Sequence, residues 1–126
     1  MGLSSARVGA AIAVSDMQRA REYYERQLGL TGGEDTSDGG RTYRCAEGTD
    51  LHIFPSAGAG KSESTIAGFT VEDVEATVDE LSGNGVTFEQ YDEPLKTDAK
   101  GIATFEGLRG AWMKDPDGNV LAITGG

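Results

Sequence analysis

The sequence predicts an α+β fold in which two tandem βαβββ modules form a curved, cup-like mixed sheet. The first observation is an internal repeat, because the segment AAIAVSDMQRAREYYERQLGL at 10–30 resembles AGFTVEDVEATVDELSGNGV at 67–86. Aligning Val14 with Val71 gives a shift of 57 residues. The second observation is that three strand-like runs follow each copy, with turn residues between them. A chain of 126 residues is long enough to bury one core.

In the first half, a short run of apolar and small residues leads to Asp16, which we expect to cap a helix. The helix carries an apolar stripe of Met17, Ala20, Tyr24 and Leu28 and ends at Gly29. Tyr24 fits this stripe, so the adjacent Tyr23 is expected at its boundary. Strands are expected near Leu30–Asp35, Arg41–Ala46 and Asp50–Pro55.

In the second half, Asp73 should cap a helix that carries Val74, Val78 and Leu81 and ends at Gly83 and Gly85. Strands are expected at Val86–Tyr91, about Leu108–Lys114 and Asn119–Thr124. The Gly-rich stretch KGIATFEGLRG, with Phe105 and Arg109, is expected to form a rim. We therefore predict a single domain over 1–126, with module one at about 6–55, a small-residue linker at 56–64 and module two at about 65–126.

The composition excludes several classes of protein. The chain has 21 acidic and 11 basic residues, a net charge of −10, which would repel a nucleic acid and favours cationic ligands or simply solubility, the commoner explanation. No window is apolar enough for a membrane span or a secretory signal. The single cysteine, Cys45, rules out an intrachain disulfide framework and is expected to be an apolar filler. A cytoplasmic location is expected.

The run DPDGN at 115–119 superficially resembles a calcium loop. Such a loop needs glycine at its sixth position and glutamate at its twelfth, where this chain has Val120 and Gly126. A turn is favoured instead: Pro116 sets φ, Asp117 is expected to bond its own backbone, and Gly118 takes the positive-φ position.

Three stretches resemble the vicinal oxygen chelate superfamily, which includes glyoxalase I, extradiol dioxygenases, fosfomycin-resistance enzymes and bleomycin-resistance proteins. They are Ala11–Leu30, Phe69–Val86 and AWMKDPDGNVLAI at 111–123. The resemblance covers nearly the whole chain and implies the fold predicted above, a concave ligand-binding surface and a homodimer. It does not imply one activity, because the superfamily hosts unrelated chemistries.

Metal-using members chelate one divalent ion with four inward side chains. The family pattern maps these positions to Gly9, His52, Ile66 and Ala122. Three of the four have no donor atom, and one imidazole cannot hold such an ion in a defined site. Shifting the alignment by one residue brings no His or Glu. We therefore expect no metal and no cofactor, which argues against glyoxalase I and extradiol dioxygenase activity.

The expected ligand-binding residues of the concave surface are His52, Phe54, Trp112, Tyr43 and Ala122. Trp112 should lie opposite Ala122 across the DPDGN hairpin, as a core residue or as a stacking platform for a flat group. His52 is the only histidine of the chain, and it is the only catalytic candidate. A strand histidine satisfied by its neighbours is slightly favoured, because a lone histidine rarely carries chemistry without an orienting partner.

Three functions remain open at this point. The first is metal-free binding of a small, cationic or aromatic molecule, as in sequestration of an antibiotic. The alternative is a lyase- or isomerase-type enzyme acting on a small metabolite, with His52 as the acid–base group beside Glu47 or Asp50. The third is an interaction module with no small ligand. Whether the protein is an enzyme stays open, and the partners expected are a small molecule and a second copy of the chain, with no nucleic acid and no membrane.

Overall fold

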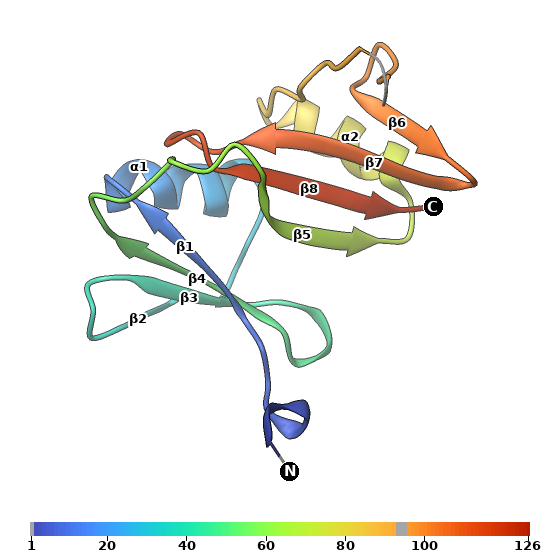
Figure 1. The fold of residues 1–126 in the computed structure, drawn as a ribbon. Helices are drawn as coiled ribbons and strands as arrows, with labels where there is room; N and C mark the ends of the chain where they lie inside the picture. The colour runs from blue at the N-terminus through green and yellow to red at the C-terminus, as the bar shows by residue number, and fades with distance from the viewer. Residues whose placement is uncertain (1, 93–95) are drawn as a thin grey trace.

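A computed structural model describes residues 2–92 and 96–126, which form two four-stranded sheets, each with one helix (Figure 1). The first half contains β1 (Ala10–Val14), α1 (Met17–Arg21), β2 (Glu34–Asp35), β3 (Arg41–Arg44) and β4 (Asp50–Pro55). The second half contains β5 (Thr65–Val71), α2 (Val74–Gly83), β6 (Ile102–Phe105), β7 (Leu108–Lys114) and β8 (Val120–Gly125). No helix in the described ranges is long and apolar enough to cross a membrane.

Both sheets have the same topology, which is what the internal repeat predicts. The strand orders are β1-β4-β3-β2 and β5-β8-β7-β6. In each sheet the first strand pairs in parallel with the last, and the remaining neighbours are antiparallel. The predicted α+β fold of two βαβββ modules is therefore confirmed.

The two aspartates expected to cap the helices do so. The Asp16 carboxylate accepts a hydrogen bond from the Arg19 N–H, and Asp73 accepts one from Ala76 N–H; both caps have extended backbone. The regular turns of α1 end at Arg21, and the chain continues as a π-helical turn over Glu22–Gln27.

The expected boundary position of Tyr23 is wrong. Tyr23 is 6% exposed and Tyr24 is fully buried, and their rings meet edge to face with centroids 5.2 Å apart. Both residues lie in the π-helical turn, whose wider winding differs from the 3.6-residue period on which the expectation rested.

The second expected strand of module two is displaced along the chain. Val86–Tyr91 forms only an isolated bridge, Phe88 to Met113, and the Glu89 N–H bonds to the Trp112 carbonyl. The strand that pairs with β7, over Leu108–Ala111, is β6, which comes from the stretch that we expected to form a rim. The turn after β6 explains this hairpin, because Glu106 and Gly107 both have positive φ, as a tight two-residue connection requires.

Each sheet packs one face against its helix, and we call the opposite face the open face. In the first sheet Ile12, Val14, Leu51 and Ile53 point into the core, so the alternate positions, including Ala11 and His52, lie on the open face. In the second sheet Ala111, Met113, Leu121 and Ile123 point toward α2, which lies behind β7 in Figure 1. The two helix-side faces contribute to one continuous hydrophobic core.

The DPDGN hairpin joins the two halves. Asp115 is 4% exposed and accepts four hydrogen bonds: from the Tyr24 hydroxyl at 2.8 Å, from the Asp117 and Asn119 N–H groups, and from the Asn119 side-chain amide. Tyr24 belongs to module one, so the Asp115 carboxylate bonds both to the turn of module two and to the helical segment of module one. Gly118 has φ +89°, as expected for the turn.

The expectation that Asp117 bonds its own backbone is wrong. Its carboxylate accepts hydrogen bonds from the N–H and hydroxyl of Ser15 and pairs with Arg19 at 3.3 Å. Asn119 extends the same contact, since its amide donates to the Ala13 carbonyl and its carbonyl oxygen accepts from Gly60 N–H. The turn chemistry expected of Asp117 is supplied by Asp115.

Candidate functional site

The two sheets approach each other along β1 and β5, and a groove of about 670 Å³ lies between these strands. Residues at the start of β1, in the β3–β4 connection and along β5 line it. A groove of this volume falls in the range of small-molecule sites. The four positions that correspond to metal ligands lie on the strands beside it: Gly9 just before β1, His52 on β4, Ile66 on β5 and Ala122 on β8.

Gly9 has no side chain to offer a metal ion, and it lies beside Asp50. A Cβ atom at this position would lie 2.5 Å from the Asp50 carboxylate, so a larger residue would require that side chain to turn away. Asp50 is also 3.5 Å from the Arg7 guanidinium. Within residues 2–92 and 96–126 no group of three or more His, Cys, Asp or Glu side chains is arranged to hold a metal ion.

His52 on the open face of the first sheet has both ring nitrogens engaged. Nε2 lies 2.7 Å from the Asp38 carboxylate, and Nδ1 lies 2.9 Å from the Thr42 hydroxyl. Its ring stacks on Phe54, with centroids 5.8 Å apart and planes at 13°. A substrate could exchange a proton with His52 only after one of these polar contacts breaks, so the arrangement favours a satisfied strand histidine.

Asp38 is the partner of His52 that sequence reasoning missed. Hydrogen bonds from Thr36, His52 and the Gly40 N–H lower the pKa of Asp38 from 3.8 to about 2. We expected Glu47 or Asp50 in this role, but neither forms a hydrogen bond or ion pair with His52 in the described part of the chain. Asp38 lies in the turn SDGG between β2 and β3. The turn reaches the imidazole ring of His52 because Thr42 on β3 pairs with His52 on β4.

Tyr43 does not share the face of His52 and Phe54, contrary to expectation. It pairs with Leu51 and is fully buried on the helix side, where its hydroxyl donates to Glu25 at 2.6 Å. Arg21 and Arg41 contact the same Glu25 carboxylate. Tyr43 therefore connects the first helix to the sheet and does not reach the open face.

Trp112 lies directly opposite Ala122 in the β7–β8 ladder, which confirms the expected register. The tip of its indole ring lies over Gly110, where an added Cβ would be 3.2 Å from the ring. Tyr91 meets it edge to face with centroids 5.8 Å apart. Trp112 is half-buried, and its face of the sheet also carries Phe105 and Leu108, which are 63% and 67% exposed.

The candidate residues thus form two separate pairs. His52 and Phe54 lie on the first sheet, and Trp112 and Ala122 lie on the second, with β1 and β5 between them. Cys45 lines the groove between the sheets, where burial and then the nearby Asp50 raise the pKa of its thiol. A raised thiol pKa fits the expected role as an apolar filler.

The sequence matches the family model described as "Glyoxalase/Bleomycin resistance protein/Dioxygenase superfamily" over residues 7–123. Among solved structures, a glyoxalase/bleomycin resistance protein from Catenulispora acidiphila is 25% identical, with a TM-score of 0.69 over 97% of this chain and 99% of that one. No curated protein sequence matches significantly.

Two further structures share the fold at lower identity. A putative glyoxalase family protein from Bacillus anthracis has a TM-score of 0.74 at 16% identity, over 96% of this chain and 94% of that one. TnmS3, an antibiotic binding protein from a Streptomyces species, has a TM-score of 0.69 at 21% identity, over 99% of this chain and 98% of that one.

Proposed function

The chain belongs to the glyoxalase/bleomycin resistance protein/dioxygenase superfamily, and on that premise we propose that it binds a small, cationic or aromatic molecule without a metal ion. The ligand lies against the open face of the second sheet, with Trp112 as its stacking platform. The observation that carries this proposal is the half-buried indole ring on a floor of small residues, Gly110 and Ala122, beside the exposed Tyr91.

The surroundings of Trp112 suit a flat organic ligand. Phe105, Leu108 and Tyr91 leave apolar area exposed on or beside the same face, and an exposed apolar patch on a soluble protein is commonly a binding surface. A heteroaromatic ring stacks favourably on indole, and a positive charge on that ring adds a cation–π contribution. The net charge of −10 favours the approach of a cation.

Sequestration of an antibiotic is the biological form of this function that we favour. One protein of the same fold, TnmS3, is described as an antibiotic binding protein. The absence of donor atoms at Gly9, Ile66 and Ala122 supports binding that needs no metal. The protein is proposed to act as a homodimer, whose second copy would cover part of the exposed apolar surface; sedimentation velocity will test this.

Catalysis by His52 is the second candidate, and one observation favours it: the contact with Asp38 supplies the orienting carboxylate that an acid–base histidine needs. Against it, Thr42 occupies the other ring nitrogen, and the Asp38 side chain is 48% exposed. We therefore favour ligand binding over acid–base catalysis by His52.

The single tryptophan makes the test direct, because Trp112 is the only indole fluorophore of the chain. Protein treated with EDTA is titrated with N-methylacridinium, a planar aromatic cation, and Trp112 emission is followed. We expect saturable quenching in the absence of metal. Unsaturable, purely collisional quenching equal to that of free tryptophan would refute a stacking site at Trp112.

A further inference from the structure

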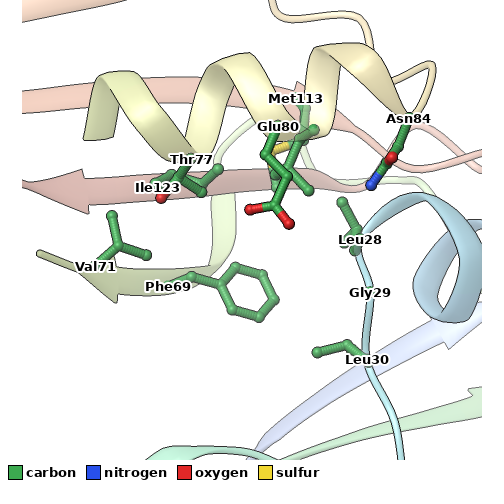
Figure 2. Close-up of a pocket in the computed structure, with 11 residues that line it drawn as sticks. Leu28, Gly29, Leu30, Phe69, Val71, Thr77, Glu80, Asn84, Met113 and Ile123 are labelled. Carbon is green, nitrogen blue, oxygen red and sulfur yellow. The ribbon is translucent and has the colours of Figure 1, made fainter. Parts of the chain in front are cut away.

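We propose a second small-molecule site, on the helix side of the second sheet, that takes an organic ammonium ion with an apolar body. It is separate from the open-face site, so it goes beyond the proposed function. The site is a cavity of about 230 Å³ between α2, β5, β7 and β8 and the segment Leu28–Leu30 that follows the first helix (Figure 2). It therefore lies where module one meets module two.

The walls of this cavity are mostly apolar. They are formed by Leu28, Leu30, Phe69, Val71, Met113 and Ile123. Leu28, Leu30, Phe69 and Val71 are only partly buried although they pack against the core, so they leave apolar surface facing the cavity. An apolar body placed here would remove that surface from water, at about 25 cal/mol per Å².

One carboxylate defines the polar end of the cavity. Figure 2 shows the Glu80 side chain extending from α2 over the space between Phe69 and Leu28. Within the described residues no Lys, Arg or His side chain forms an ion pair with Glu80. Its helix neighbours are different, since Glu75 and Asp79 both pair with Lys100. Glu80 is thus a carboxylate at the mouth of an apolar cavity, and it has no cationic partner among residues 2–92 and 96–126.

The other polar groups at the cavity suit a cationic ligand of small size. Thr77 and Asn84 lie on the same side as Glu80, and Asn84 already donates to the Gln27 carbonyl, which fixes the end of α2 to module one. The volume is below the range typical of drug-sized ligands. A single ring or short chain with one ammonium group matches both the volume and the charge.

The alternation of β5 separates this cavity from the open-face site. Phe69 and Val71 point to the helix side and line the cavity, whereas Gly68 and Thr70 point to the opposite face. Trp112 and Met113 are divided in the same way on β7, with Met113 at the cavity. The cavity and Trp112 therefore lie on opposite faces of the second sheet, so variants can distinguish the two sites.

The test uses two matched probes, phenethylammonium and the neutral 2-phenylethanol, titrated into ¹⁵N-labelled protein and followed by NMR. We expect saturable shifts at the amides of Thr77, Glu80 and Asn84. Glu80→Gln should weaken binding of phenethylammonium about tenfold, because it removes a charge-assisted hydrogen bond, and should leave 2-phenylethanol within about twofold. Asp79→Asn is the matched control, since it removes the same charge from the next residue, which faces Lys100.

Two further variants keep the test decisive. Leu30→Trp fills the cavity from a partly buried position and should weaken both probes. Trp112→Ala should leave the affinities of both probes measured at the amides of Thr77, Glu80 and Asn84 unchanged, so failure of the open-face proposal does not affect this one. The proposal is overturned if phenethylammonium gives no saturable shifts at the cavity, or if Glu80→Gln and Asp79→Asn weaken it equally.

Discussion

Replacement of Asp115 by alanine tests the claim that the DPDGN hairpin holds the two modules together. The substitution removes the acceptor of four hydrogen bonds from Tyr24, Asp117 and Asn119, all at 2.8–2.9 Å. The site is closed to solvent, since Asp115 is 4% and Asn119 is 4% exposed. Water cannot take over these contacts without opening the turn.

The expected loss follows from this geometry. A hydrogen bond to a charged group contributes about 1.5–3 kcal/mol, and the donors left behind carry their own desolvation cost. Loss of the buried charge offsets part of this, so we expect Asp115→Ala to lower the free energy of unfolding by about 3–5 kcal/mol. That is a large share of the roughly 5–15 kcal/mol typical of a domain.

Urea unfolding followed by circular dichroism measures this loss. Tyr24→Phe removes one of the four donors and should cost about 1–1.5 kcal/mol. In the Asp115→Ala background it should cost clearly less, because the shared contact is already gone. Glu63→Ala, at an exposed position, should stay within about 0.5 kcal/mol. A loss below about 1 kcal/mol for Asp115→Ala would refute the structural role given to this carboxylate.

The other predictions concern the two open faces. Trp112→Ala should weaken binding of N-methylacridinium at least tenfold while the unfolding midpoint in urea changes little; equal affinity would defeat the stacking proposal. Gly110→Val should push the indole off the sheet and shift its emission to longer wavelength, since even a Cβ lies 3.2 Å from the ring; an unchanged spectrum would contradict this geometry. His52→Gln should leave the affinity for N-methylacridinium within about twofold, and a complete loss of binding would show that His52 belongs to the ligand site. The folded-state pKa of Asp38 is lowered to about 2, so its contribution to stability is present above about pH 4 and is lost as the pH falls through 2. The difference in melting temperature between wild type and Asp38→Asn should therefore shrink over that interval, and a constant difference would argue against the hydrogen bonds that Thr36, His52 and Gly40 donate to Asp38.

Local and periodic features of the fold could be predicted from the sequence. The shift between Val14 and Val71 indicates two modules, and the two strand orders are identical. Asp16 and Asp73 cap their helices because a short side chain with an acceptor oxygen can reach the unpaired N–H groups of the first helical turn. The position of Trp112 opposite Ala122 follows from a tight hairpin, in which turn length sets the register.

The features that were missed depend on non-local pairing. Tyr43 faces the core because β3 pairs with β4 in a register that no short turn fixes, and a shift of one residue would have reversed its face. Asp38 reaches His52 for the same reason. Ser15 and Asp117 lie 102 positions apart in the chain, so their contact becomes visible only when the modules pack.

Metal content tests the central claim, metal-free binding, most directly. The purified protein is incubated with Mn²⁺, Fe²⁺, Ni²⁺ and Zn²⁺, desalted and analysed for bound ions, and the same samples are titrated with N-methylacridinium. We predict far less than one ion per chain and the same quenching of Trp112 with and without EDTA. About one tightly held ion per chain, with binding that EDTA abolishes, would contradict the account and make a metalloenzyme the better explanation.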